Sequence, residues 1–351
     1  MSIYMISNRK VTDGEFSNKG RENAKREFRV AHCHIPEKGD KAEYDILEDH
    51  ELRGYQNVLK EFDSDGDLDL SKLNGTAHMF ADLYSQMLKA GSKQSDTLFF
   101  IHGFANDMDS SLEHIKSLYD AFLKPQASGI DHMVYVSWPS IGGLIGTYGD
   151  DQDDAEETGR ALGGLFSKLR SFFTEIFEKG GHDLCANRIH LAAHSMGNTV
   201  LDYMLQNIPE RKLFNLFGEA LLLHADVRHD IFEGNGSFSR LDQLASRTHI
   251  YISRSDDVLS RISTYTKNFV KRLGHKGPKN LSALPDNTFV VDTTNVGKAE
   301  GILEASLDHW GYLKRNAVRR DIRYVLAGVD EEDIPKRKGS RKGKAFFRLK
   351  K

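Results

Sequence analysis

The chain has 351 residues, of which 39% are hydrophobic and 28% are charged, and this composition is that of an ordinary globular protein. The formal net charge of -3 gives no general attraction to nucleic acid, so no specific nucleic-acid partner is predicted. The two cysteines do not make a disulfide framework, the first residues lack the pattern of a signal peptide, and no uncharged apolar run reaches ~18 residues. These features predict a cytoplasmic location, and the sequence gives no indication of the oligomeric state.

Short apolar and β-branched runs alternate with longer amphipathic segments, which is typical of a mostly parallel sheet covered by helices. Strands are expected at residues 3–7, 27–34, 97–102, 133–137, 188–193, 220–224, 249–253 and 288–291. Helices are expected at residues 75–90, 110–123, 155–178, 196–206, 259–273 and 306–326. The fold class is therefore α/β, with a doubly wound, mostly parallel sheet of about eight strands and helices on both faces.

One domain is expected over residues 1–330, in which residues 1–95 supply N-terminal strands and a polar insertion, and residues 96–326 form the core that carries the motifs below. Residues 331–351 are expected to form a disordered basic tail, because residues 336–351 include nine Lys or Arg. The interleaved Phe346, Phe347 and Leu349 leave a weak contact with an anionic surface as the alternative for this tail.

The strongest local motif is Ala193-His194-Ser195-Met196-Gly197, which stands between an apolar strand and an amphipathic helix. A nucleophilic serine on such a sharp turn needs small residues two positions before and after it, and Ala193 and Gly197 meet this need. The Met196 N–H would then lie at a helix start, where it can stabilise an oxyanion. His194 is expected to line the substrate site. The alternative is a serine that only caps the helix.

A second apolar strand ends in His102-Gly103-Phe104-Ala105, which matches the loop that supplies the other oxyanion donor in such a site. Gly103 lets this turn approach the substrate, and the N–H of Phe104 or Ala105 would face the developing charge. His102, Gly103 and Trp138 are expected to line the substrate site. The alternative is an ordinary turn at a strand end, with His102 buried.

The acid and the base of a triad should follow the serine in that order. Asp256 and Asp257 follow a strand, and Asp256 is preferred, while Asp257 and Asp226 stay open as alternatives. A buried carboxylate at this place would hold the imidazole of the base in the required tautomer. His309, the last of the 15 histidines, follows the last expected strand and is the candidate base.

Together these motifs resemble a widespread bacterial α/β-hydrolase family that is still labelled as a domain of unknown function. The resemblance covers about residues 97–312 and rests on residues 100–104, 136–140, 188–191, 193–198, 255–259 and 308–312. It implies the α/β-hydrolase fold, makes Ala193 normal at the first position of the elbow, and implies Asp256 as the acid. The family more often has Asn where this chain has Ala105, and it carries no settled substrate.

The expected function is hydrolysis of a carboxylic ester, as by an esterase or lipase, through an acyl-enzyme on Ser195 with a Ser-Asp-His triad. A small-molecule or lipid-like acyl ester is expected because the candidate lining residues Phe104, Trp138, Ile141 and Leu144 are apolar. This chemistry requires neither a metal nor an organic cofactor. A thioesterase or amidase, and a non-catalytic binding or scaffold protein on the same fold, remain alternatives.

Overall fold

The computed structural model describes residues 1–20, 28–47, 73, 75–91, 93–141, 148–180, 187–209, 215–263, 270–296, 308–340 and 343–351. Its strands are β1 (Ile3–Ser7), β2 (Arg9–Thr12), β3 (Glu15–Gly20), β4 (Arg29–His34), β5 (Glu43–Ile46), β6 (Asp96–Ile101), β7 (Ile130–Ser137), β8 (Ile189–His194), β9 (Phe217–Leu223), β10 (Ala245–Ile252), β11 (Thr288–Asp292), β12 (Arg337–Ser340) and β13 (Gly343–Leu349). Its α-helices are α2 (Gly75–Lys89), α3 (Met108–Leu118), α4 (Tyr148–Gly180), α5 (Gly197–Gln206), α7 (Leu273–Lys276), α9 (Gly311–Lys314) and α10 (Asn316–Leu326). Shorter helical turns are η2 (Tyr119–Leu123), η5 (Ser237–Gln243), η6 (Val258–Ser263), η7 (Leu281–Ala283) and η8 (Thr294–Val296).

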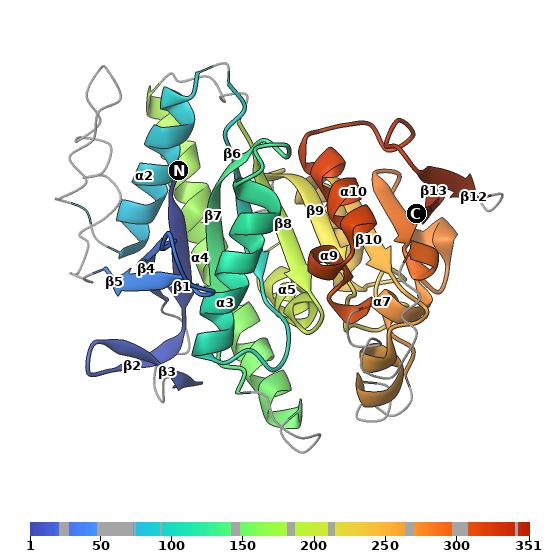
Figure 1. Ribbon diagram of the computed structural model, residues 1–351, viewed down its shortest axis with the longest axis horizontal. Helices are drawn as coiled ribbons and strands as arrows, with labels where there is room; N and C mark the ends of the chain where they lie inside the picture. The colour runs from blue at the N-terminus through green and yellow to red at the C-terminus, as the bar shows by residue number, and fades with distance from the viewer. Residues whose placement is uncertain are drawn as a thin grey trace.

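An 11-stranded sheet in the order β12-β13-β11-β10-β9-β8-β6-β7-β1-β4-β5 forms the centre of the molecule (Figure 1). The strands from β13 to β1 in this order run parallel, whereas β12, β4 and β5 join antiparallel at the two edges. The predicted fold class is therefore confirmed, with a larger sheet than the expected one. The additional strands are β5, β12 and β13, and β2 and β3 form a separate two-stranded sheet.

Helices cover both faces of the sheet, as the sequence predicts. Leu191 and Ala193 of β8 point into the apolar layer beneath α2, α4 and α5, whereas the intervening Ala192 points into the layer beneath α3 and α10. This period of two is that of a strand buried on both faces, and it explains why the centre of β8, Leu191-Ala192-Ala193, is apolar at every position. In Figure 1, α3, α9 and α10 lie in front of the sheet.

The prediction of a disordered basic tail is wrong. Residues 337–340 and 343–349 form β12 and β13, and β13 pairs parallel with β11. Phe346, Phe347 and Leu349 are buried, at 6%, 5% and 1% exposure. Burial of these apolar side chains stabilises the segment, although the many basic residues around them are typical of a disordered tail. Arg337 contributes further, because its guanidinium donates to both carboxylate oxygens of Asp321.

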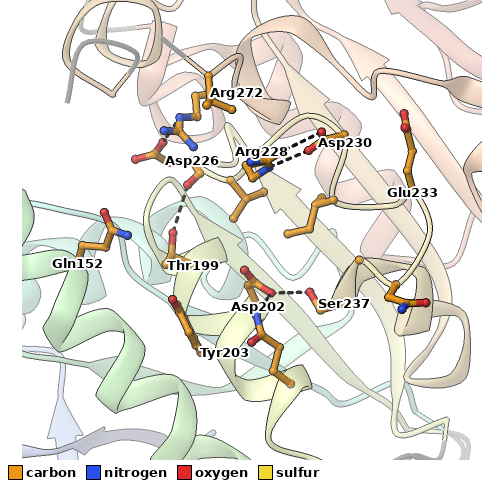
Figure 2. A pocket seen from close by; sticks show the side chains of 16 residues that line it. Gln152, Thr199, Asp202, Tyr203, Asp226, Arg228, Asp230, Glu233, Ser237 and Arg272 are labelled. Atoms are coloured by element: carbon orange, nitrogen blue, oxygen red, sulfur yellow. Dashed lines mark hydrogen bonds and ion pairs between the residues drawn. The ribbon is translucent and has the colours of Figure 1, made fainter. Parts of the chain in front are cut away.

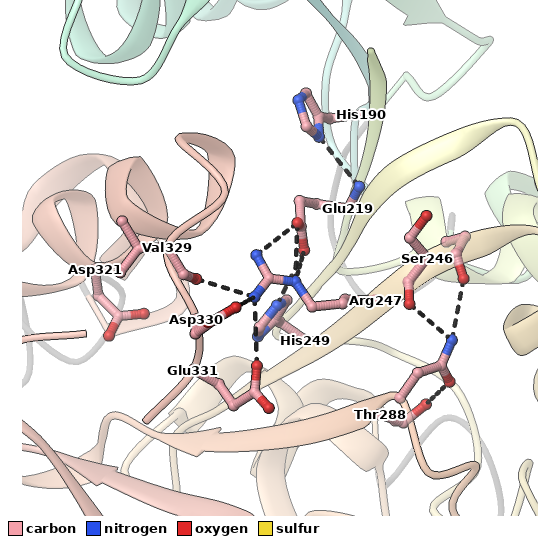
Figure 3. Close-up of polar contacts among 12 residues, drawn as sticks. His190, Glu219, Ser246, Arg247, His249, Thr288, Asp321, Val329, Asp330 and Glu331 are labelled. Atoms are coloured by element: carbon pink, nitrogen blue, oxygen red, sulfur yellow. Dashed lines mark hydrogen bonds and ion pairs between the residues drawn. The ribbon is translucent and has the colours of Figure 1, made fainter. Parts of the chain in front are cut away.

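A buried polar cluster lies where β9 and β10 begin (Figure 3). Arg247 donates to Glu219 at 2.7 and 3.0 Å, and His249 Nε2 lies 3.2 Å from the same carboxylate. Arg247 also donates to the Val329 carbonyl and to Glu331, at 3.0 and 3.3 Å. The cluster therefore fastens the segment after α10 to the amino ends of the parallel strands.

Two of the expected helices lie partly outside the described residues. These parts are residues 264–269 of the helix expected at residues 259–273, and residues 306–307 of the helix expected at residues 306–326. Most of the polar insertion, residues 48–72, lies outside the described residues as well. Among the described helices, none combines the length and the apolar character needed to cross a bilayer.

Candidate active site

Ser195 occupies a strained turn between β8 and α5. Its φ angle is 51°, in the left-handed region that non-glycine residues seldom adopt. Three hydrogen bonds hold this conformation: the Ser195 N–H donates to the Leu223 carbonyl at 2.9 Å, and the Ser195 carbonyl accepts from the N–H groups of Asn198 and Asp226 at 3.0 Å each. Such a turn presents a serine side chain at the carboxyl end of a central strand.

Two glycines allow the chain to pack tightly around Ser195. A Cβ on Gly197 would lie 2.5 Å from the His102 carbonyl oxygen, so α5 could not begin this close to the end of β6 with a larger residue. A Cβ on Gly103 would lie 2.8 Å from Ser195 Cβ. The loop after β6 therefore lies directly against the serine, and Met196, the N-cap residue of α5, follows the serine in the chain. A loop that supplies an oxyanion donor would need this position.

His102 and Trp138 support this loop. Trp138 donates its backbone N–H to His102 Nε2 at 3.0 Å and its indole N–H to the His102 carbonyl at 2.8 Å, and the two rings stack 5.1 Å apart. Both side chains are fully buried. Burial, followed by the charge of Arg9, holds the pKa of His102 well below its usual value. The two side chains pack against each other, and a contact of either with substrate stays a prediction.

The remaining predicted lining residues differ in their exposure. Phe104 is partly buried, with its ring 5.3 Å from that of Tyr148, and Ala105 is exposed with a φ of 57°. Ile141 is 51% exposed. Leu144 lies outside the described residues.

Asp256 and His309 come together from distant parts of the sequence. His309 Nδ1 lies 2.8 Å from Asp256 Oδ2, and the Leu259 N–H donates to Asp256 Oδ1 at 3.1 Å. Asp256 is fully buried, and His309 is 5% exposed. Burial alone raises the pKa of Asp256, but His309 and a second imidazole, that of His224, outweigh it, so the pKa lies well below its usual value. The carboxylate is therefore ionised and orients the His309 ring.

His194 connects His309 to the elbow. Its Nε2 donates to the His309 carbonyl at 2.9 Å, and the two rings lie 4.7 Å apart. Because His194 immediately precedes Ser195, this bond ties the backbone of His309 to the end of β8. Burial, followed by the nearby His309, keeps the pKa of His194 well below its usual value, so the ring is neutral. His194 thus fixes the backbone of His309, the candidate base, and its predicted contact with substrate stays a prediction.

The two other candidate acids have different surroundings. Asp226 pairs with Arg272 at 3.3 Å and accepts a hydrogen bond from the Tyr148 hydroxyl. Asp257 is partly exposed, whereas Asp256 is the residue whose carboxylate contacts His309.

Sequence reasoning missed His224, which follows β9. Its Nδ1 lies 2.9 Å from Asp256 Oδ2, the same oxygen that His309 contacts. Possible ligand atoms of His224, Asp256 and His309 lie within 4.8 Å of one another, a spacing that a metal ion could span. Both Nδ1 atoms are at hydrogen-bonding distance from the carboxylate, however, so they act as N–H donors to it and not as lone-pair donors to a cation. The sequence offered one signal for His224. It is a histidine at the end of an apolar strand, and the two neighbouring strands lead to the candidate serine and the candidate acid.

A pocket of about 910 Å³ lies against α5 and the segment that follows β9 (Figure 2). It is lined by Thr199, Asp202 and Tyr203 of α5, the residues that follow β9, and Arg272. Thr199 donates to the Asp226 carbonyl at 3.1 Å, and Asp202 accepts from Ser237 at 2.5 Å. The pocket shares the Asp226 backbone with the elbow and is strongly polar.

The mostly parallel sheet, the strained serine after β8 and the buried histidine–carboxylate pair are features of an α/β hydrolase. A family described as "Alpha/beta hydrolase of unknown function (DUF900)" matches residues 80–326, and the chain belongs to this family. No curated protein matches the chain. Membership supports a hydrolase-type function in general, and the family description specifies no substrate.

Proposed function

We propose that the protein is a serine hydrolase that cleaves a carboxylic ester through an acyl-enzyme on Ser195. The observation that carries the proposal is the contact of 2.8 Å between His309 Nδ1 and the buried Asp256, held beside the elbow by His194. This contact leaves His309 Nε2 as the ring atom that can accept a proton from the serine. Met196 and the loop of Phe104 and Ala105 are the proposed sources of the oxyanion donors.

In the first step, Ser195 Oγ attacks the ester carbonyl carbon while His309 Nε2 takes the hydroxyl proton, and Asp256 stabilises the imidazolium. The backbone N–H groups stabilise the oxyanion until the C–O bond breaks. The leaving alcohol then takes the proton from His309. Water then attacks the acyl-enzyme while His309 takes one of its protons. His309 returns this proton to Ser195 Oγ as the acyl bond breaks, which releases the acid and restores the Ser195 hydroxyl. Apart from this water, no step requires a group from outside the chain and the substrate.

Hydrolysis of short p-nitrophenyl esters tests this proposal. We expect turnover by the wild type and a loss of about 10⁶-fold in kcat for Ser195→Ala, as for other nucleophile deletions. Ser128→Ala is the matched control, because Ser128 is fully buried and donates to the Phe122 carbonyl at 2.6 Å before β7 begins. This control should keep wild-type turnover. Wild-type protein that hydrolyses none of the esters would instead favour the non-catalytic scaffold.

The choice of leaving group needs a separate comparison. An ester, a thioester and an amide of the same acyl group should be offered to the wild type at equal concentration. The proposal expects the highest kcat/KM for the ester. A higher value for the thioester or amide would keep Ser195 as nucleophile and replace the proposed substrate class.

A further inference from the structure

His224 is a second imidazole on the carboxylate of the proposed triad. Its Nδ1 lies 2.9 Å from Asp256 Oδ2, and its ring centre lies 5.9 Å from that of His309. The side chain is 1% exposed. Its φ angle is 46°, so the neighbouring strands β8 and β9 are each followed by a non-glycine residue with left-handed backbone, Ser195 after β8 and His224 after β9. Strain of this kind persists only where surrounding contacts enforce it, and it is concentrated at functional sites.

The hydrogen bonds around Asp256 determine the tautomer of His224. Oδ2 is shared by the Nδ1 atoms of His224 and His309, while Oδ1 accepts from the Leu259 N–H. His224 Nε2 is buried without a hydrogen-bond partner. A proton on that atom would be an unsatisfied buried donor, so the neutral ring with its proton on Nδ1 fits the surroundings.

We propose that His224 is a positioning residue that holds Asp256 against His309 and takes up part of the negative charge on its carboxylate. This inference rests on the proposed function, because it concerns the acid of that triad. Two donors on one oxygen leave less of its charge to stabilise protonated His309 than a single donor would. His224 therefore has two effects: it fixes the direction of the His309 ring, and it shares the carboxylate charge that stabilises the protonated form of that ring.

Other groups around His309 do not account for this effect. His194 faces it from the end of β8, and burial keeps that ring neutral. His224 faces it from the end of β9, and Asp256 from the loop after β10. Asp308, next in the chain, is paired with Arg315 at 2.9 Å. Among these neighbours, His224 is the one that contacts the same carboxylate oxygen as the base.

Two substitutions separate the hydrogen bond from the ring. His224→Leu removes the donor to Asp256, whereas His224→Asn places an amide N–H close to where Nδ1 lies. We expect the Leu variant to lose about tenfold in kcat with little change in KM, a loss typical of residues that orient a functional side chain. The acid limb of its kcat profile should move to higher pH by about 1 unit. The Asn variant should recover most of the rate and of the pH profile.

His190→Leu is the matched control. It also removes a fully buried imidazole that lies 3.1 Å from a buried carboxylate, that of Asp96, but at the opposite ends of the strands. It should leave the pH profile unchanged. The proposal is overturned if folded His224→Leu keeps the wild-type pH profile and rate, or if His190→Leu shifts the profile equally.

Nitrogen-15 NMR of the imidazoles keeps the inference testable whatever the activity and whatever the folding of the Leu variant. In the wild type, the neutral His224 ring should be observed with its proton on Nδ1. His309 should titrate at higher pH in whichever of His224→Leu or His224→Ala folds. A His224 proton on Nε2 in the wild type would refute the proposal. Because this signal needs no turnover, an inactive wild type would disprove the esterase alone.

Discussion

The two ends of the parallel strands both contain buried histidine–carboxylate contacts, but they differ in what else holds the carboxylate. At the amino ends, Glu219 is bonded to His249 and also to Arg247, which donates to it at 2.7 Å (Figure 3). At the carboxyl ends, Asp256 is bonded to two imidazoles and a backbone N–H.

The difference shows how similar side chains can serve different purposes. A guanidinium stays protonated at any ordinary pH, so Arg247 fixes the charge of its cluster permanently. An imidazole can gain and lose a proton near neutral pH, so the contacts of Asp256 suit a site that moves protons. We therefore expect substitutions at the carboxyl ends of the strands to affect the reaction. Substitutions at the amino ends of the strands should affect stability.

The largest expected effect is that of Asp256→Asn. The amide should leave the shape of the site intact but favour the wrong tautomer of His309, and kcat should fall about 10⁴-fold. Steady-state kinetics on an active ester measures this change, and thermal unfolding measures the accompanying change in stability. Full activity in Asp256→Asn would remove Asp256 from the triad, and Asp226→Asn would then be the variant to examine.

Glu219→Gln should lower the stability of the protein and leave its catalytic rate unchanged. Removal of one partner from a buried ion pair leaves the charge of Arg247 poorly compensated and costs about 3–5 kcal/mol of folding free energy. Denaturant unfolding measures this loss, while kcat per folded molecule should stay at the wild-type value. A stable Glu219→Gln variant with impaired catalysis would contradict the division between the two ends.

Acid should destabilise the protein through its buried histidines, and His114 is a clear case. Burial lowers its pKa from 6.5 to about 3, so the unfolded chain binds this proton more readily than the folded protein. Stability contributed by neutral His114 is complete above the unfolded pKa and is lost as the pH falls from 6.5 towards 3. The slope is up to ~1.4 kcal/mol per pH unit for this residue. Urea unfolding at several pH values should show a shallower slope for His114→Gln; an unchanged slope would contradict this assignment.

The smallest expected effect concerns the basic residues of β12 and β13. Because Phe346 and Phe347 are buried, contact with an anionic surface would depend on exposed cations such as Lys338, Arg348 and Lys350. We propose a weak contact with each cation contributing ~1 kcal/mol near the surface. Co-flotation with anionic vesicles should therefore decrease when the three are replaced by Gln, and at high salt for the wild type. Equal co-flotation with neutral vesicles would rule out this contact.

The sequence predicts the centre of the fold well because buried parallel strands are continuous apolar runs. All eight expected strands are present, as β1, β4 and β6 to β11. The two strands at the edges of the sheet lack such an apolar run. β12 is Arg-Lys-Gly-Ser, and β5 is Glu-Tyr-Asp-Ile with exposed and partly buried residues in alternation. Such edge strands are held by pairing with a neighbour, which local sequence does not encode.

The same contrast applies to the site. Ser195 and its surrounding small residues form a continuous motif, and the structure places His309 and Asp256 in contact. The choice between Asp256 and Asp257 depends on the direction of a turn, and the role of His224 depends on a contact between residues 32 positions apart. Neither leaves a local pattern. The burial of Trp138 was also hidden, because an aromatic residue after a strand can equally face a substrate.

The central claim is that Ser195 is the nucleophile, and covalent labelling with a fluorophosphonate tests it most directly. Intact mass and peptide mapping should show one adduct on Ser195 in the wild type and none in Ser195→Ala, with both proteins equally folded. Labelling of Ser195→Ala at the wild-type rate, or an adduct on another residue of the wild type, would contradict the account.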